Sequence, residues 1–302
     1  MVGSSLMREL DSSSKDSAIG LCRADFDLRD PDALATTLAR EKPDVLIHAA
    51  AKVGGLEANI KNAFEFLASN LTMDANVIQS SISAGVPNLL YLGSSCMYPK
   101  DYRQPLLEGD LLAGPLEPTN EGSAIAKIAA SKLCELASYS FGLNYRTIIP
   151  SNLFGPGDNF KLGSSHLIAS VLRKVHEAKL AGASHIEVWG SGSARREFTY
   201  VGDLASWVVA SLPNISELPS TLNLGIGEDH SIDEFYSAAM SALEYEVPLV
   251  HDTSKPEGMK AKLMDSSHAR QNHAWDPKTD LLTGLKMTYK WFLESQDKDA
   301  RL

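Results

Sequence analysis

Three short, almost wholly apolar runs limit the fold of this chain more than any other feature of its sequence. They are "DVLIHAA" (44–50), "LLYLGSS" (89–95) and "YRTIIPSN" (145–152), and each ends in small or polar residues. Apolar residues stand at consecutive positions instead of alternate ones, so both faces of each strand must be covered by other elements. Such strands are typical of parallel sheets, and the runs therefore predict one.

Helix-length stretches separate the three runs, at residues 31–41, 57–84 and 120–141. Strand and helix in repeated alternation predict an α/β fold with a Rossmann-like, doubly wound parallel sheet. In such sheets, ligands bind at the carboxyl ends of the strands. Those ends read "HAAAKVGG", "GSSCMYP" and "PSNLFGPGDNF", and we expect the site there.

The regular alternation of strand-like and helix-length stretches ends after residue 153. A capping-box pattern of Ser231 and Glu234 predicts the start of one helix. Further helices and strands are expected at about 164–181, 186–190, 221–227 and 282–295. We therefore expect a smaller, discontinuous α/β substrate lobe beside the first domain. The dinucleotide-binding domain would comprise residues 1–153 and about 202–228, and the substrate lobe about 154–201 and 229–302.

Composition narrows the class of protein. A formal net charge of −10 argues against nucleic acid as the main partner. No apolar run approaches the roughly 20 residues that cross a bilayer, so no membrane contact is expected. The cysteines Cys22, Cys96 and Cys134 have no CxxC spacing and cannot all pair, which favours a reducing, cytoplasmic setting. No metal site is expected.

Five motifs are specific enough to suggest a family: "AAKVGG" (50–55), "LGSSCMYPK" (92–100), "GPLEPTNEGSAIAKIA" (114–129), "PSNLFGPGDNF" (150–160) and "VWGSGSARREF" (188–198). They resemble those of GDP-L-fucose synthase, and the resemblance covers nearly the whole chain. It implies an extended short-chain dehydrogenase/reductase that converts GDP-4-keto-6-deoxy-mannose to GDP-L-fucose with NADPH. It also implies a homodimer, formed through the long helices expected at 57–84 and 120–141. Other nucleotide-sugar epimerases of the superfamily fit less well, because they lack the cysteine of "SSCMYPK".

The resemblance assigns the chemistry to five positions. A ketone at C4 acidifies the hydrogens on C3 and C5, and the acid/base pair that inverts both centres would be Cys96 and His166. Reduction would use Ser94 on the carbonyl oxygen and Lys127 on the nicotinamide ribose. The tyrosine that donates the proton in this superfamily is replaced by Ser123. Taken singly, Cys96 also suits a small buried residue, and His166 a histidine on a helix surface.

"NEGSAIAK" (120–127) places Ser123 and Lys127 on one helix face. A serine hydroxyl is too short and too weak an acid to replace the phenol, so we expect reduction to be slowed by about 10²–10⁴-fold. Tyr98 is a candidate substitute, although the sequence does not place its hydroxyl. Two alternatives stay open: an epimerase without reductase activity, and a silent homologue that binds nucleotide.

Further contacts follow from the resemblance alone. Those with NADP are Gly3, Arg23, Leu92, Gly93, Ser94, Ser95, Lys127, Pro150, Ser151, Asn152, Leu153 and His166. Those with the GDP-sugar are Lys174, Trp189, Arg196 and Asp265. Arg23 would follow a second strand, "SAIGLC" (17–22), and meet the 2′-phosphate of NADPH. Arg23 and Lys174 also suit solvated surface charges, and "RRE" (195–197) a plain surface turn.

The first residues, "MVGSSLMREL", look like the last glycine of a dinucleotide-binding loop, Gly3, and the helix after it. The strand and the earlier glycines of that fingerprint are not in the sequence. We expect strands with unpaired edges and impaired NADPH binding if the sequence is complete as given. Met1 as an internal methionine of a longer protein would explain the pattern.

Overall fold

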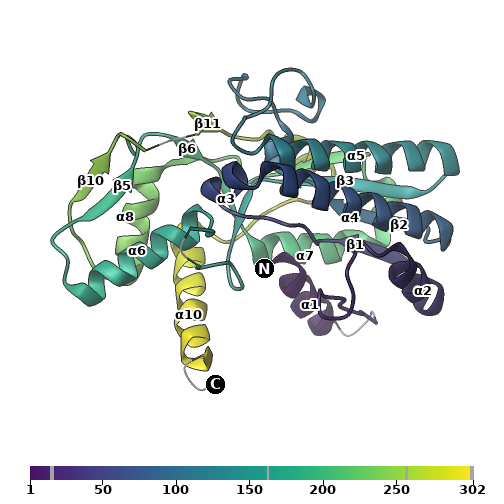
Figure 1. Ribbon diagram of the computed structural model, residues 1–302, viewed down its shortest axis with the longest axis horizontal. Coiled ribbons are helices and arrows are strands. Elements are labelled where there is room, and N and C mark those ends of the chain that lie inside the picture. The colour runs from purple at the N-terminus through teal and green to yellow at the C-terminus, as the bar shows by residue number, and fades with distance from the viewer. Residues whose placement is uncertain (14–16, 162, 256–257, 300–302) are drawn as a thin grey trace.

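A four-stranded parallel sheet with the strand order β1-β2-β3-β8 forms the centre of the molecule (Figure 1). The computed structural model describes residues 1–13, 17–161, 163–255 and 258–299. The sheet strands are β1 (Val45–His48), β2 (Asn88–Leu92), β3 (Asn144–Pro150) and β8 (Thr221–Leu224). The predicted fold class, α/β with a Rossmann-like parallel sheet, is confirmed.

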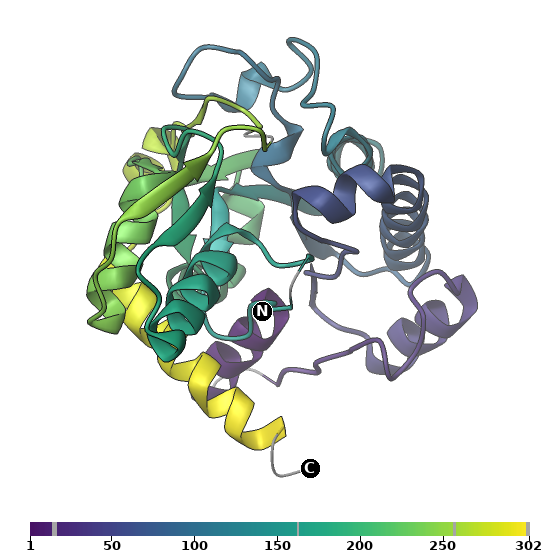
Figure 2. The same cartoon turned by 60° about the vertical axis from the view of Figure 1, so that its left-hand side comes forward.

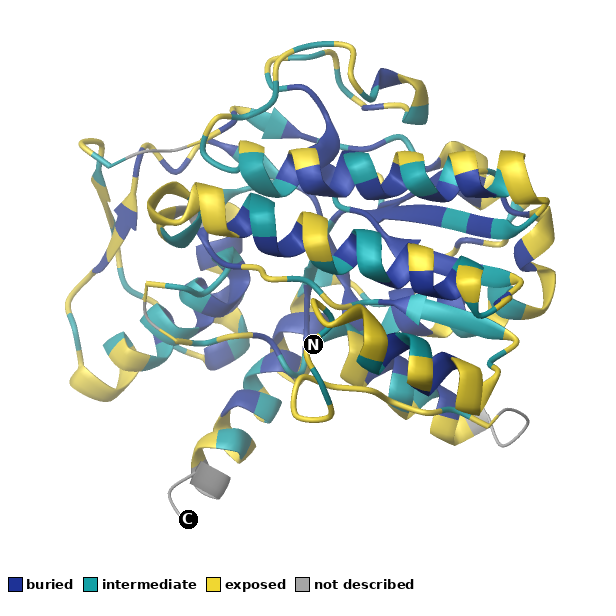
Figure 3. Cartoon of the chain, turned by 45° about the vertical axis from the view of Figure 1, so that its right-hand side comes forward, coloured by how far each residue is buried: buried dark blue, intermediate teal, exposed yellow. Residues whose placement is uncertain are grey.

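Helices cover both faces of the sheet (Figures 1 and 3). One face carries α2 (Pro31–Glu41), α4 (Ala63–Ser83) and α5 (Glu121–Phe141), and the other carries α1 (Val2–Ser13) and α7 (Val201–Ser211). In each of these layers the apolar stripe faces the strands and the outer side is largely exposed (Figure 3).

Strand β2 shows how consecutive apolar residues satisfy both layers. Leu89 and Tyr91 pack into the cluster of α2, α4 and α5. Leu90 and Leu92 pack into the cluster of α1 and α7. Successive side chains of a strand point to opposite faces, so an unbroken apolar run can serve two helix layers. The prediction of strands that are buried on both sides is confirmed here.

The long helix predicted at 57–84 is two helices, α3 (Leu56–Lys61) and α4. The break lies at Asn62, whose backbone is not helical (φ −125°, ψ 33°). Its side-chain amide donates to Ala58 O at 3.0 Å, a local bond that competes with a continuous helix. The prediction of a single helix is therefore wrong at this position.

Strand β1 pairs with β2 alone among the described residues. The strand predicted for "SAIGLC" (17–22) is not formed, so this prediction is wrong. A strand requires a hydrogen-bonding neighbour, and no described strand pairs with residues 17–22. Arg23 consequently lies in an exposed turn that no strand precedes.

A second group of elements lies beside the sheet, around its own apolar cluster (Figure 2). It contains the parallel pair β5 (Ile186–Trp189) and β10 (Leu249–Asp252), with α6 (Leu167–Ala181), α8 (Ile232–Leu243) and α10 (Leu281–Asp299). The capping box is confirmed: Glu234 N donates to Ser231 Oγ at 3.1 Å, and Ser231 N to Glu234 Oε2 at 2.6 Å.

The remaining elements are short. They are η1 (Ser95–Met97), η2 (Glu108–Asp110), β4 (Asn152–Phe154), β6 (Arg195–Arg196), β7 (Phe198–Tyr200), η3 (Leu212–Glu217), β9 (His230–Ser231), β11 (Ala261–Lys262) and α9 (Ser267–Asn272). The division into two domains stays a prediction. Ala269 and Trp275, which it assigns to the substrate lobe, pack with α7 and β8.

Removing a side chain from the doubly covered strand should lower stability strongly. Leu90 has no exposed surface, so Leu90→Ala should reduce the free energy of unfolding by about 2–5 kcal/mol. Leu180 is 76% exposed, and Leu180→Ala should change it by less than about 0.5 kcal/mol. Urea denaturation followed by circular dichroism measures both. Equal losses would contradict the two-sided burial of β2.

Candidate active site

The turn after β2 places two candidate residues side by side at the carboxyl edge of the sheet. Gly93 N donates to Ile148 O at 2.8 Å, which holds the turn against β3. A Cβ on Gly93 would lie about 3.1–3.2 Å from Met97, Ile148 and Ile149, so any side chain at this position would crowd the turn. Ser94 then precedes η1, and its Oγ accepts from Cys96 N at 3.3 Å.

Lys127 is fixed directly beneath this turn. Its Nζ donates to Leu92 O at 2.7 Å and lies 4.5 Å from the centre of the Tyr91 ring. The side chain is buried, and burial lowers the pKa of its ammonium group. The attachment to a strand carbonyl sets the position of the charge without help from the side chain at 123.

A buried polar network that the sequence did not reveal supports the Tyr91 ring. Asp74 on α4 accepts from Tyr91 OH at 2.6 Å, and its other oxygen lies 2.7 Å from His48 Nε2. His48 and Asp74 are only 3% and 1% exposed. The one signal in the sequence is that Asp74 stands among buried apolar positions of α4, such as Val77 and Ile78.

Ser123 lies one turn before Lys127, half-buried, with its hydroxyl engaged elsewhere. Its Oγ donates to Asn59 Oδ1 at 2.9 Å. The Asn59 amide in turn donates to Gly54 O at 2.7 Å and to Gly55 O at 3.1 Å. Ser123 therefore ties the start of α5 to the loop after β1.

Tyr98 does not suit the role of a substitute acid. The residue is buried, and its hydroxyl donates to Asn223 Oδ1 on β8 at 2.6 Å. Burial raises the pKa of the phenol further above its usual range. The candidate role considered for Tyr98 is therefore not supported.

His166 and Cys96 reach the same edge of the sheet from different segments. His166 is half-buried and stands just before α6, at the end of a loop fastened to the loop after β1 by Gly55 N donating to Ser164 O at 3.1 Å. Its charged neighbour is the buried Asp158. Burial raises the pKa of Asp158, and the nearby His166 lowers it. The role of the two residues as an acid/base pair stays a prediction.

The other residues predicted to contact NADP divide into two groups. Leu92, Gly93, Ser95 and Pro150 are buried at strand ends, and Ser151, Asn152 and Leu153 follow β3. Ser151 Oγ lies 2.7 Å from Thr199 Oγ1, and Asn152 Nδ2 donates to Glu197 O at 2.9 Å, so both join β4 to β7.

Gly3 and Arg23 differ from the others. Gly3 lies inside α1 instead of in a loop before it, and a Cβ there would meet no atom within 4 Å. Arg23 is exposed. Among the described residues, nothing in the surroundings of Gly3 or Arg23 sets either apart as a binding residue.

Two of the predicted substrate residues, Lys174 on α6 and Trp189 on β5, lie on the second group of elements. Lys174 Nζ donates to Glu187 O at 3.0 Å and lies 5.5 Å from the ring of Trp189, which is 46% exposed. Burial lowers the pKa of Lys174. Lys255 Nζ approaches the same ring at 5.4 Å, a neighbour that the sequence did not reveal.

Arg196 and its neighbour on β6 have different surroundings. Arg195, left unassigned from the sequence, forms ion pairs with Asp229 at 2.7 Å and Glu234 at 3.3 Å. Arg196 is half-buried, burial lowers its pKa, and its side chain donates only to the carbonyl of Arg195 among the described residues. Arg196 is therefore the one with a guanidinium free for a ligand.

Asp265 and Glu197 hold the chain near the site. Asp265 Oδ1 accepts from Ser267 N at 2.8 Å and stabilises the start of α9. Glu197 is 1% exposed and accepts from Gly227 N at 2.7 Å and Met264 N at 3.0 Å. Burial raises the pKa of Glu197 to about 7. Reasoning from the sequence missed Glu197, since a carboxylate in "RRE" suits an exposed turn equally well.

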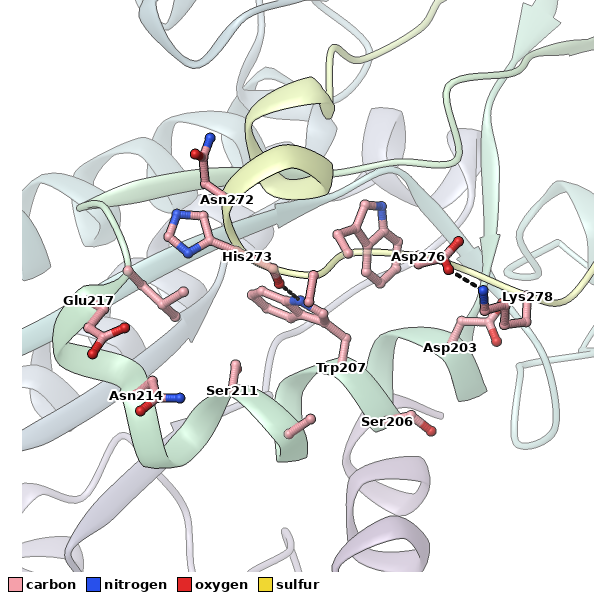
Figure 4. A pocket seen from close by; sticks show the side chains of 14 residues that line it. Asp203, Ser206, Trp207, Ser211, Asn214, Glu217, Asn272, His273, Asp276 and Lys278 are labelled. Carbon is pink, nitrogen blue, oxygen red and sulfur yellow. Dashed lines mark hydrogen bonds and ion pairs between the residues drawn. The ribbon is translucent and has the colours of Figure 1, made fainter.

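A separate hollow of about 460 Å³ lies between α7, η3 and the segment 272–278 (Figure 4). Trp207 lines it and donates from Nε1 to His273 O at 2.7 Å. None of the candidate site residues lines this hollow.

A Rossmann-type parallel sheet with a lysine anchored beneath the turn after β2 is the arrangement expected of the short-chain dehydrogenase class, and this chain belongs to the epimerase/dehydratase branch. The model of the NAD dependent epimerase/dehydratase family matches residues 1–225. GDP-L-fucose synthase of Escherichia coli (strain K12) is 40% identical over 306 residues, which cover 99% of this chain and 95% of that protein. The chain belongs to the NAD dependent epimerase/dehydratase family and, within it, to the GDP-L-fucose synthase family.

Solved structures agree with this assignment. A GDP-6-OMe-4-keto-L-xylo-heptose reductase from C. jejuni has a TM-score of 0.91 at 30% identity, covering 97% of this chain and 95% of that one. A GDP-L-fucose synthetase from Naegleria fowleri, bound to NADP, has a TM-score of 0.87 at 27% identity, covering 98% and 91%. No helix within the described ranges has the length and apolar character that crossing a membrane requires.

Breaking the network beneath Lys127 should be costly. Asp74→Ala leaves His48 and Tyr91 OH buried without their acceptor, so the free energy of unfolding should fall by about 3–5 kcal/mol. Asp44 is exposed, and Asp44→Ala should lower it by less than about 0.5 kcal/mol. Urea denaturation at pH 7 measures both variants. A loss at Asp74 no larger than at Asp44 would show that the network contributes nothing to stability.

Proposed function

We propose that this chain is an NADP-dependent enzyme that epimerises GDP-4-keto-6-deoxy-D-mannose at C3 and C5 and reduces it at C4 to GDP-L-fucose. The observation that carries the proposal is 40% identity to a GDP-L-fucose synthase along 99% of the chain. The turn with Ser94 and Cys96, and Lys127 beneath it, support it. We also place the protein in the cytoplasm, since its cysteines are free thiols.

The epimerisation needs a base and an acid on opposite sides of the sugar ring. In the proposed step, the thiolate of Cys96 removes the proton from C3 or C5, and the electron pair of the C–H bond moves onto the C4 oxygen as an enolate. His166 then returns a proton to the other face of the carbon. An imidazole suits this role because it changes charge near neutral pH.

The reduction needs a proton donor for the C4 oxygen when bound NADPH transfers hydride. We propose that Lys127 binds the ribose of the cofactor and that Ser94 donates its hydroxyl to the carbonyl oxygen. Ser123 supplies no comparable acid, and its hydroxyl already donates to Asn59. We therefore propose that reduction, not epimerisation, is the slow part of the reaction.

The nucleotide would bind along β5 and α6 of the second group and along β6. Arg196 offers a planar pair of donors to the diphosphate, and the exposed face of Trp189 offers a surface for packing. Lys174 and Asp265 would supply further polar contacts. We further propose that these residues belong to a substrate lobe distinct from the dinucleotide-binding domain.

Restoring the phenol should restore reduction. Ser123→Tyr should raise the rate of NADPH oxidation with the keto-sugar by about 10²–10⁴-fold. Ser123→Phe is the matched control, because it adds the same ring without the hydroxyl and should bring no gain. If the tyrosine variant is no faster than the phenylalanine variant, the missing acid is not the limiting defect.

Isotope exchange separates the full activity from its alternatives. In heavy water, deuterium should enter C3 and C5 of the keto-sugar, and NADPH should be oxidised slowly. Exchange with no NADPH oxidation, even by Ser123→Tyr, would identify an epimerase only. Stabilisation by the GDP-sugar with neither exchange nor oxidation would identify a silent homologue.

We propose that the protein is a homodimer through α4 and α5. Exposed apolar side chains lie on both helices: Phe64 is 82%, Leu136 57% and Tyr139 90% exposed. Spacings of 7 residues from Phe64 to Leu71 and 11 from Ile125 to Leu136 keep them on one face of each helix. An apolar face of this extent is typical of a protein interface.

A charge on this face should separate the two copies. Leu136→Asp should lower the mass in light scattering from twice 32.7 kDa to 32.7 kDa, because an unpaired carboxylate is costly to bury. Leu180→Asp, on the far helix α6, should leave the mass unchanged. A wild-type protein that is already monomeric would refute the dimer.

A further inference from the structure

Glu197 stands between β6 and β7, and its two carboxylate oxygens bond to two other segments of the chain. The side chain is buried, with 1% of its surface exposed. Its Oε1 accepts from Gly227 N at 2.7 Å, in the loop after β8. Its Oε2 accepts from Met264 N at 3.0 Å, in the segment after β11. One carboxylate therefore links three parts of the chain that lie far apart in the sequence.

The loop after β8 has room for this carboxylate because residue 225 is a glycine. A Cβ on Gly225 would overlap Glu197 Oε1 and lie 2.7 Å from the carboxylate carbon, closer than unbonded atoms can approach. Gly225 N also donates to Ser266 Oγ at 2.6 Å, so the loop after β8 meets the segment after β11 at this place. The carboxylate fills the space that remains between them.

The residues beside these contacts are the ones proposed to bind the GDP-sugar. Arg196 directly precedes Glu197, and Asp265 directly follows Met264. Strands β6 and β11 are parallel, and Arg196 stands opposite Lys262. The bond between Glu197 and Met264 lies just beyond these paired residues. It therefore sets how far apart the segments that carry Arg196 and Asp265 can move.

Backbone N–H groups stabilise this carboxylate. Within the described ranges, no cation forms an ion pair with Glu197. Burial raises its pKa to about 7, and Asp229, just before β9, acts in the same direction. The backbone N–H groups that bond to it act in the opposite direction. Lys262 on β11 is the cation that faces it, since Glu197 raises the pKa of Lys262.

We propose that the Glu197 carboxylate is a positioning residue, which holds Arg196 and Asp265 at the separation that the GDP-sugar requires. The inference rests on the proposed function, in which these two residues bind the nucleotide. An ionised carboxylate accepts well at both oxygens, whereas in a protonated one the oxygen that carries the hydrogen is the weaker acceptor. The link to Gly227 and Met264 should therefore be complete only in the ionised form.

A direct effect of the charge would have the opposite sign. A carboxylate near a diphosphate repels it, so removing the negative charge of Glu197 would strengthen the binding of GDP if nothing else changed. Loss of the link would instead let Arg196 and Asp265 move apart, and binding would weaken. The direction of the change therefore separates positioning from simple electrostatics.

Hydrogen exchange tests the link without any ligand. In Glu197→Gln, the NH₂ group of the new side chain cannot accept, so either Gly227 N or Met264 N loses its acceptor. The peptide that contains this amide should exchange about tenfold faster at pH 8, as measured by mass spectrometry. Peptides from β2 should keep their rate, because the sheet does not depend on this bond.

Glu228→Gln is the matched control, because it removes an exposed carboxylate next to Gly227. It should leave the exchange of both peptides unchanged. Unchanged exchange at both Gly227 and Met264 in Glu197→Gln would overturn the proposal.

Calorimetry with GDP tests the consequence for binding. At pH 8, GDP should bind about tenfold more weakly to Glu197→Gln than to the wild type, and equally well to Glu228→Gln. Gly225→Ala should also weaken binding, since its Cβ displaces the carboxylate without removing it. Equal or tighter binding of GDP by Glu197→Gln would contradict the positioning role, even if hydrogen exchange confirmed the link.

The pH dependence of binding is a readout that a purely structural role would not produce. With a pKa of about 7, Glu197 is mostly ionised at pH 8 and mostly protonated at pH 6. The ratio of the wild-type and Glu197→Gln affinities cancels the titration of GDP itself. It should fall from about tenfold at pH 8 to about twofold at pH 6. A ratio that stays constant would contradict a role for the ionised form.

The wild type alone should show the same transition. Exchange at Gly227 and Met264, corrected for the intrinsic effect of pH on amide exchange, should be faster at pH 6 than at pH 8. Equal corrected rates at the two pH values would count against the proposal without any variant. A wild type that binds no GDP would refute the proposed function, and the exchange rates would still decide whether Glu197 holds these segments.

Discussion

The burial of β2 on both faces is the constraint on which the rest of the structure depends. Leu89 and Tyr91 need one helix layer and Leu90 and Leu92 the other, so this strand must lie inside the sheet. Its carboxyl end is then held between β1 and β3, and the turn that follows has little freedom. The position of Cys96 therefore follows from the burial of β2 between its two helix layers, which fixes the end of the strand and the turn after it.

The sequence predicts those features that depend on local pattern. Continuous apolar runs identify β1, β2 and β3, because a strand that is buried on both faces carries apolar residues at consecutive positions. The capping box at Ser231 is a local arrangement too. The strand expected at 17–22 fails for the opposite reason: a strand also needs a neighbour, and composition alone does not supply one.

The sequence predicts which positions form the candidate site, but not which other residues their side chains contact. Matched motifs located Ser94, Cys96 and Lys127, and the structure places them around one turn. The network of His48, Asp74 and Tyr91 was not predictable, because each residue comes from a different element and none carries a signal of its partner. The same holds for Lys262 and Arg196, whose register only the paired strands β11 and β6 reveal.

The way in which Lys127 is held explains how the fold accommodates a serine at 123. In a site where the lysine depended on the phenol for its position, replacing the tyrosine would free the charge and disturb both cofactor and substrate. Here a strand carbonyl and the Tyr91 ring hold the ammonium, and both are independent of residue 123. Ser123 instead bonds to Asn59 and keeps the loop after β1 attached to α5. The two proposed roles of this helix are cofactor binding by Lys127 and proton donation from position 123. They are physically separable, because only proton donation depends on the phenol.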